Sequence, residues 1–172
     1  MDDTGLLLKK KLKMYQGLEA MLNRISPEIC NVIDLGAFLQ ATVDELGRTM
    51  DVCRCEVLVR EGHDHLKVAY EYMGDISLSS HLSRTFPARR LVNGLDGEGW
   101  KEVLAIDAVD SNSLSEPYQH ILQGREILSA IIVPIRFKEA FLALVGLYHC
   151  RRPYTWSPEE ISFLKSIAQQ VA

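Results

Sequence analysis

The sequence of 172 residues predicts one domain of the mixed α/β (α+β) class, in which helices pack on an antiparallel sheet. Three observations indicate this class. A helical apolar stripe comes first, a stretch of period-two alternation follows, and two strongly apolar strand-like segments precede an amphipathic helix. Because 47% of the residues are hydrophobic, the chain can bury one sizeable core.

Residues 1–25 are predicted to form a connector helix, and residues 26–172 the domain itself. The helix has a seam that repeats every seven residues, as a two-helix coiled coil requires. The seam consists of Leu8, Tyr15 and Leu22 at one heptad position and Lys11, Leu18 and Ile25 at its partner. An amphipathic helix that lies on its own domain would show the same pattern, so both interpretations stay open.

The domain is predicted to begin with helices. Ser26 and Pro27 are residue types that favour a helix start, and Asp34 is placed to cap the following helix. That helix carries an apolar stripe that faces a core. The stripe consists of Leu35, Phe38, Leu39, Val43, Leu46 and Met50.

From Cys53 onward the period is two, which predicts a β-hairpin around the turn sequence EGHDH, with one buried and one wetter face. This turn places Arg60 opposite His65. The first strand alternates Cys53, Cys55, Val57 and Val59 with Arg54, Glu56, Leu58 and Arg60. The return strand is expected to hold one set on a single face, namely Leu66, Val68, Tyr70 and Tyr72.

Two pairs in this hairpin, Cys53-x-Cys55 and His63-x-His65, have the spacing of zinc ligands. In the predicted register, however, Cys55 lies five residues beyond Arg60, on the order of 16 Å away at ~3.3 Å per residue. Four side chains so arranged cannot close around one ion. We therefore expect core thiols, histidines on an exposed turn, and no metal.

Residues 75–126, here called the cassette, are rich in Ser, Gly, Asp and Asn and contain one short strand-like run, KEVLAID. So long a weakly regular segment in a compact domain usually forms binding loops. The following segments, SAIIVPIRF and AFLALVGLYHC, are apolar on both faces, which predicts central strands covered on both sides. Pro134 in the first of them predicts a bulge or a partner strand on one side only.

The last helix has a complete start signal in the sequence WSPEEI. Ser157 is the predicted N-cap, Pro158 occupies the first position, and Glu160 closes a capping box. Trp156 and Ile161 flank this box at the spacing of a hydrophobic staple.

The order of helix, hairpin, cassette, apolar strand pair and final helix resembles a GAF domain from residue 29 to the end. The likeness rests most on the sequences IIVPI, residues 131–135, and WSPEEISFLKSIAQQVA at the C-terminus. It implies an antiparallel sheet of about six strands, adjacent N- and C-terminal helices, and a pocket under the cassette. It also implies a sensory role, since GAF domains mostly bind small molecules and signal to attached output domains.

The resemblance places ligand contacts in the second half of the cassette. Our candidate ligand-binding residues are Asp107, Asp110, Tyr118, His120 and Tyr148. Each also has a structural interpretation, because the aspartates could cap turns, Tyr148 could be core, and His120 could lie on the wet side of a short helix. No catalytic residue is assigned.

The implied function is that of a non-enzymatic regulatory domain in a larger bacterial signalling protein of the two-component or sensor-kinase type. We expect a homodimer formed through the N-terminal helix, the C-terminal helix or both. The sequence ISFLKSIAQQVA has no stop signal, which predicts that the helix runs on into an output domain. The alternative is a dimerisation scaffold that binds no ligand.

An enzyme of the methionine sulfoxide reductase type is a further alternative, which in this family needs cysteines just ahead of the VP strand. The segment SNSLSEPYQHILQGREIL contains none. His149 and Cys150 are adjacent in a strand, so their side chains are expected on opposite faces and cannot form a catalytic dyad.

The strand ending GLYHC, with an Arg/Pro/Trp run after it, is most similar to the phytochrome-like and cyanobacterial branch of the family. In that branch a Cys-His pair precedes the VPI strand and anchors a bilin. The matching position here is Pro117-Tyr118. Because neither residue supplies a thiolate, no covalent bilin is expected, no cofactor is assigned, and a non-covalent ligand stays open.

The 19 basic and 23 acidic residues give a net charge of −4, which argues against a nucleic-acid partner. The longest apolar run, residues 140–148, is far short of the ~20 residues that span a bilayer. No signal peptide is recognisable. We expect a cytoplasmic protein with reduced thiols.

Overall fold

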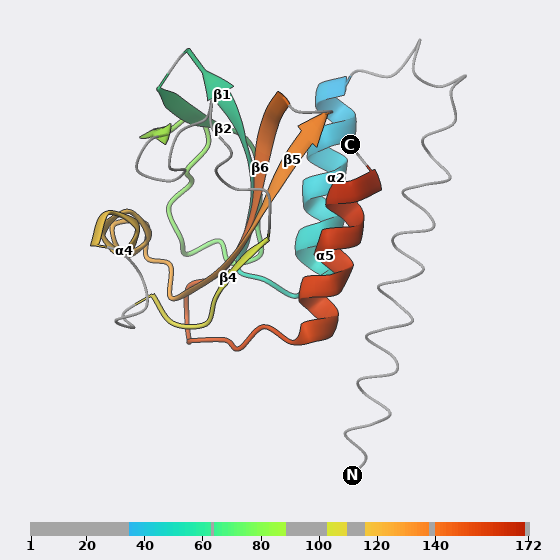
Figure 1. The fold of residues 1–172 in the computed structure, drawn as a ribbon. Helices are drawn as coiled ribbons and strands as arrows, with labels where there is room; N and C mark the ends of the chain where they lie inside the picture. The colour runs from blue at the N-terminus through green and yellow to red at the C-terminus, as the bar shows by residue number, and fades with distance from the viewer. Residues whose placement is uncertain (1–34, 63, 89–102, 110–115, 138–139, 171–172) are drawn as a thin grey trace.

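A computed structural model describes residues 35–62, 64–88, 103–109, 116–137 and 140–170. Six strands form one antiparallel sheet in the order β3-β2-β1-β6-β5-β4 (Figure 1). The strands are β1 (Arg54–Glu61), β2 (His65–Met73), β3 (Thr85–Pro87), β4 (Leu104–Ile106), β5 (Ser129–Phe137) and β6 (Ala140–His149). The predicted connector helix at residues 1–25 and the predicted cap at Asp34 lie outside the described residues.

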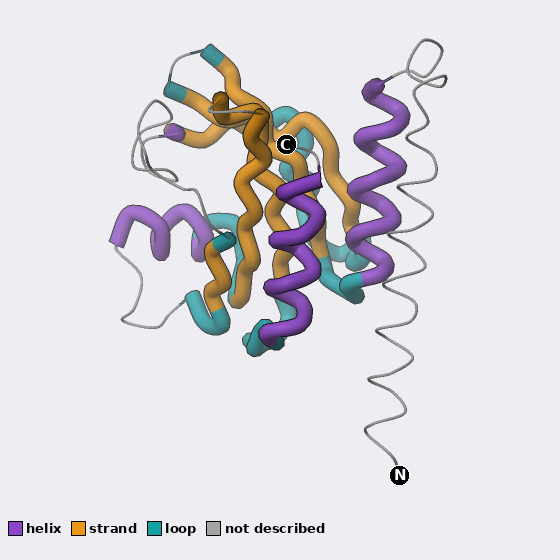
Figure 2. Tube along the Cα trace, turned by 45° about the vertical axis from the view of Figure 1, so that its right-hand side comes forward, coloured by secondary structure: helices purple, strands orange, loops and turns teal. Residues whose placement is uncertain are grey.

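Helices cover both faces of the sheet, which confirms the predicted α/β (α+β) class. Helices α2 (Leu35–Thr49) and α5 (Pro158–Gln170) are neighbours on one face (Figures 1 and 2). Helix α4 (Glu116–Gln123) lies on the opposite side, together with the described parts of the cassette. Each face has its own apolar core, so the sheet is the middle layer of three.

The core under α2 and α5 confirms the predicted helical stripe at its C-terminal end. Val43, Leu46 and Met50 are buried against the sheet, as is Leu164 from α5. Among the described residues, no helix has both the length and the apolarity needed to cross a membrane.

The β1–β2 hairpin forms as predicted, but its register differs by one residue. Arg60 pairs with Leu66 rather than His65, because Glu61 is the residue that pairs with His65 next to the turn, and the ladder shifts again between Val57 and Leu58. The shift leaves Ala69 as an extra residue in β2, a bulge that exchanges the faces of the side chains beyond it.

Because of this bulge, the side chains of the return strand do not share one face as predicted. Tyr70 and Tyr72 pack on the core under the helices, whereas Leu66 and Val68 belong to the core under the cassette. The four residues expected on one face therefore divide between two.

The expectation of a wetter face on β1 is also wrong. Arg54 and Glu56 are 1% and 0% exposed, because the cassette covers this side of the sheet. Alternation between polar and apolar residues predicts a solvated face only when nothing else packs there.

The apolar strand pair forms the centre of the sheet, as expected. β6 lies between β1 and β5, and both neighbours run antiparallel to it. Pro134 has the predicted surroundings, because the described part of β4 pairs only with residues 130–132 of β5 and the β5–β6 register shifts just after Ile135.

The capping box at the start of α5 is confirmed. The Ser157 hydroxyl accepts the Glu160 N–H at 3.2 Å, and the Glu160 carboxylate accepts the Ser157 N–H at 2.8 Å. Trp156 is buried in the same apolar cluster that Ile161 packs against, which agrees with the predicted staple.

Candidate functional site

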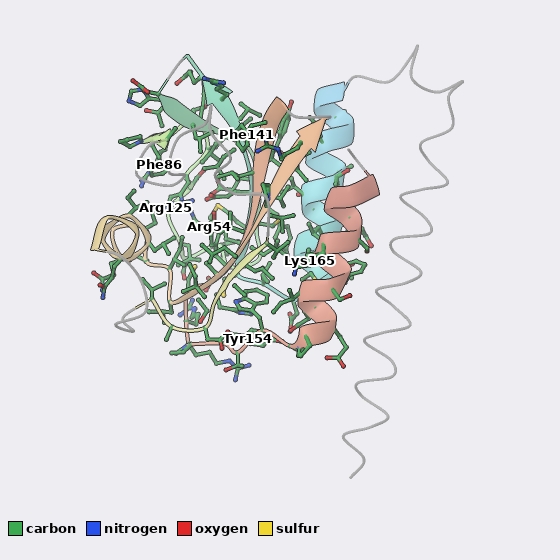
Figure 3. All side chains as sticks on the ribbon, in the orientation of Figure 1. Arg54, Phe86, Arg125, Phe141, Tyr154 and Lys165 are labelled. Carbon is green, nitrogen blue, oxygen red and sulfur yellow. The ribbon has the colours of Figure 1, made fainter. Side chains whose placement is uncertain are left out.

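Five charged or titratable side chains meet between the sheet and the cassette, and we call them the charged cluster. They come from β1, β2, the loop after β2 and the turn after α4, and they are Arg54, Glu56, Glu71, His81 and Arg125. The residues Arg54, Glu56, His81 and Arg125 are at most 4% exposed. Figure 3 shows Arg54 and Arg125 on the side of the sheet that α4 covers, away from α5.

Arg54 holds the sheet side of the charged cluster together. Its Nη1 lies 3.1 Å from a Glu71 oxygen and 3.4 Å from a Glu56 oxygen. Its Nη2 donates to the carbonyl of Ser79 at 2.7 Å, which ties the loop after β2 to the sheet. Charge-assisted hydrogen bonds of this kind offset part of the desolvation of both ions.

Arg125 closes the charged cluster from the other side. Its Nη2 donates to the second Glu56 oxygen, and its Nε lies 3.3 Å from His81 Nδ1. The guanidinium carbon lies 4.5 Å from the ring centre of Phe86 and 5.1 Å from that of Tyr148. One carboxylate, one imidazole and two aromatic rings thus surround a single guanidinium.

Glu56 is ionised in this setting. Burial raises the pKa of its carboxyl, but the Arg125 guanidinium and then His81 lower it further, so the net pKa lies below the usual range. His81 Nδ1 is 2.9 Å from the other Glu56 oxygen. The formal charges of the two arginines balance those of the two glutamates.

The ring of Tyr148 lies against the Arg125 guanidinium. It is 1% exposed, and burial raises the pKa of its phenol, so the hydroxyl stays protonated. A Cβ on Gly146 would lie 1.9 Å from this hydroxyl oxygen, so the phenol extends over a position that only glycine can occupy. Gly146 also pairs with Glu56 across the β1–β6 ladder.

A metal ion does not fit the charged cluster. Ligand atoms of Glu56, Glu71 and His81 lie within 4.8 Å of one another, which is close enough to share an ion. Both carboxylates already bind guanidinium groups, however, and a divalent cation would add two positive charges beside Arg54 and Arg125. The arginines take the place that a cation would need.

Of the five predicted ligand-binding residues, the structure describes the side chains of Asp107 and Tyr148. Tyr148 is part of the walls around Arg125, as described above. Asp110 lies outside the described residues. Tyr118 and His120 belong to helix α4, but the structure does not describe their side chains.

Asp107 has a structural contact. It is exposed at the end of β4, and its carboxylate accepts the Trp156 N–H at 3.1 Å. Its carbonyl accepts from the Ser129 hydroxyl, which in turn accepts the Tyr154 N–H at 2.7 Å. Asp107 therefore anchors the segment that leads into α5.

His149 and Cys150 lie on opposite faces of the sheet, as predicted. The His149 ring stacks on Tyr154 at 4.2 Å and lies 5.4 Å from the Trp156 ring, under the helices. Cys150 packs on the cassette side, and burial raises its pKa to about 12. The Cys150 thiol is therefore a poor nucleophile, and it points away from the His149 imidazole.

The position expected for a bilin anchor lies at the start of a helix. Helix α4 begins at Glu116, so Pro117 and Tyr118 are in its first turn, ahead of β5. Burial also raises the pKa of Cys55, which points into the core under the helices. Neither Cys55 nor Cys150 offers a ready thiolate.

Most of the charged cluster is not predicted by the sequence pattern. Arg54 and Glu56 were assigned to a wetter face, and His81 and Arg125 were not singled out. A usable signal was present, since an Arg-x-Glu pair on a central strand with Glu71 on the neighbouring strand requires either solvent or counter-charges. Nothing in the local sequence distinguishes these two environments.

Comparison with known proteins gives a consistent picture. The GAF domain family profile matches residues 34–172. The chain is 23% identical over 175 residues to the circadian input-output histidine kinase CikA of Thermosynechococcus vestitus, covering 96% of this chain and 24% of that protein. It spans about a quarter or less of the curated relatives that it matches.

Solved structures with the same fold include two photoreceptor domains. One is the phycoerythrobilin-bound GAF domain from a cyanobacterial phytochrome, with a TM-score of 0.74, 18% identity and coverage of 94% of this chain and 93% of that one. The other is the chromophore-binding domain of a bacteriophytochrome from R. palustris, with a TM-score of 0.76, 14% identity and coverage of 94% and 59%.

Proposed function

Because the chain belongs to the GAF family, we propose that it is the sensory module of a longer signalling protein and binds a small molecule beneath the cassette. The relatives support the first part, since one is a histidine kinase of which this chain matches a quarter. We propose a two-component type of protein in the cytoplasm, with an output domain attached and no enzymatic activity in this module.

The observation that carries the proposal is the charged cluster. Burying ions removes several kcal/mol of hydration per group, and well-packed apolar residues are often as stable or more so in their place. The position of the cluster between sheet and cassette is where the family resemblance puts a ligand. The charged cluster therefore supports a role in ligand recognition more than a role in stabilising the fold.

Arg54 adds a second argument. Its Nε is buried and has no hydrogen-bond partner among the described residues. A buried donor without an acceptor destabilises the fold by about 1–3 kcal/mol. A bound molecule or an ordered water would supply the missing acceptor.

The earlier candidates extend this proposed site. Tyr148 contributes a ring beside Arg125. Asp107, Asp110, Tyr118 and His120 stay part of the proposal as ligand contacts. Replacing Tyr118 and His120 with Ala should leave the melting temperature within a few degrees if they line a site, whereas loss of folding would make them core residues.

A dimerisation scaffold is the second candidate. Arg125 and His81 already fill part of the space beneath the cassette, which favours a domain that needs no ligand. In that case the domain would act as a homodimer through its N-terminal helix, α5 or both. The same helices could also pair in a sensor, so dimerisation alone does not separate the two candidates.

Native mass spectrometry of the protein purified from its own host separates them. A retained molecule that leaves on denaturation supports the sensor. Absence of any added mass, in protein that is folded and dimeric, contradicts the sensor and supports the scaffold.

A covalent bilin is not expected, because Pro117 and Tyr118 stand where the anchor would be. Co-expression with a bilin-producing pathway should give no zinc-fluorescent band after denaturing electrophoresis. A band at the mass of the protein would contradict this expectation.

A further inference from the structure

The turn after α4 places Arg125 in an unusual position for an arginine. Its neighbours Gln123, Gly124 and Glu126 are exposed, while Arg125 itself is 4% exposed. Its backbone N–H donates to the carbonyl of Leu122 at 3.1 Å, so the residue belongs to a surface turn. The side chain reaches inward from this turn to Glu56 and the ring of Phe86.

The groups around the Arg125 head form a complete recognition site for a cation. Phe86 and Tyr148 present their ring faces, Glu56 supplies a charged acceptor, and His81 lies beside them with its Nδ1 2.9 Å from a Glu56 oxygen. Phe86 lies on the edge strand β3 and is half-buried, so one wall of this site is at the surface. Figure 3 shows Phe86 and Arg125 close together on this side of the molecule.

We propose that these four residues, Phe86, Tyr148, Glu56 and His81, are a binding site for an organic cation with a guanidinium or primary amine head. Arg125 occupies the site in this structure and leaves it when the ligand binds. This inference rests on the proposed sensory function and specifies the chemistry of its ligand.

The charge balance favours a cation over an anion. Without the Arg125 head, Glu56 and Glu71 face only Arg54, which leaves one uncompensated negative charge in a buried site. An organic cation restores the balance and regains the contacts with both rings. An anion that joined Arg125 would instead add a negative charge beside two carboxylates.

The test uses methylguanidinium as the probe, with methylurea as its neutral counterpart of similar shape. The full 172-residue chain is titrated at constant ionic strength, and the Arg125 Nε–H resonance is followed by NMR. We expect saturable binding of methylguanidinium and movement of this resonance away from its ring-shifted position. Methylurea should do neither.

Three variants sharpen the test. Arg125→Ala should bind methylguanidinium more tightly than the wild type, because the internal competitor is gone. Phe86→Leu should weaken binding by about 2- to 30-fold through loss of one cation–π contact. Arg84→Ala, which removes an exposed arginine from the same cassette, should leave the affinity unchanged.

Several outcomes would overturn the inference. They are absence of saturable binding to both the wild type and Arg125→Ala, equal binding of methylurea, and binding only after Arg125 is removed. The last result would make Arg125 a permanent part of the core. Should native mass spectrometry find a neutral or anionic ligand, the cation site fails while the sensory function stands.

Discussion

Gly47 in α2 lies against the ring of Tyr72 from β2. A Cβ at this position would be 2.0 Å from Cδ1 and 2.5 Å from Cγ of that ring. Gly47→Ala would gain about 1 kcal/mol from helix propensity. Because the clash is with the base of the ring rather than a flexible end, overpacking of about 1–3 kcal/mol should outweigh the gain. Urea unfolding should therefore show net destabilisation.

The matched control is Arg48→Ala on the exposed side of the same helix. Its ion pairs with Asp44 and Glu45 are on the surface, so its free energy of unfolding should change by no more than about 0.5 kcal/mol. A stabilised Gly47→Ala would mean that Tyr72 has room to move.

Glu56 gives a prediction for the dependence of stability on pH. Its pKa is lowered in the folded state, so its contribution is present above its unfolded pKa near 4.5 and is lost as the pH falls through the folded value. Glu56→Gln should be less stable than the wild type by about 3 kcal/mol at pH 7. This difference should shrink below pH 4.5, because a protonated glutamate and a glutamine are both neutral.

Urea unfolding of both proteins at pH 7, 4.5 and 3 measures the difference. Glu61→Gln, an exposed residue on the same strand, serves as control and should show little difference from the wild type at any pH. A constant gap between wild type and Glu56→Gln down to pH 3 would contradict the lowered pKa.

Ser157 defines the start of α5, and its capping box supports a prediction about the whole element. Ser157→Ala should lower the free energy of unfolding by about 1 kcal/mol, because the Glu160 N–H loses its acceptor. Ser157→Gly should lose less, since glycine is tolerated at this position. Thermal and urea unfolding of both variants would check the order.

Glu160 also accepts the Tyr154 hydroxyl at 2.7 Å, so Glu160→Gln alone would disturb two contacts. Tyr154→Phe removes the second contact and isolates the box. Equal stability of Ser157→Ala and the wild type would show that water replaces the cap without loss.

Elements with a strong local pattern were predictable from sequence. β5 and β6 follow from unbroken apolar runs and α5 from its capping residues, because these signals need no knowledge of the rest of the chain. The three-residue strand β3 carries no such signal. The exact hairpin register depends on the turn, where Glu61 pairs with His65, and on the bulge at Ala69, and alternation alone predicts neither.

At the scale of the molecule, residues 1–25 remain proposed as a connector that pairs between chains. Deleting residues 1–24 should then convert a dimer into a monomer, as measured by light scattering. The fold should persist, because the family match begins at residue 34. A dimer that survives the deletion would place the interface elsewhere, most plausibly on α5.

The fold class was predictable because it follows from the order of elements, whereas the charged cluster was not. Glu56 and Arg125 are 69 positions apart and meet only when the cassette folds over the sheet. Of the two candidates with described side chains, Asp107 and Tyr148, it is Tyr148, chosen through the family resemblance, that lies beside the cluster. A sequence pattern reports on neighbours along the chain, and this site is made of distant ones.

The last two residues of β6 are adjacent in the chain, but their side chains lie on opposite faces of the sheet. Tyr148 lies under the Arg125 head, and the next residue, His149, stacks on Tyr154 beside Trp156 at the entrance to α5. If ligand binding beneath the cassette twists this end of β6, we expect the His149 imidazole to turn relative to the Trp156 indole. We expect the emission of Trp156, recorded in a Trp100→Phe variant because the chain has two tryptophans, to change when a ligand binds on the far side of the sheet.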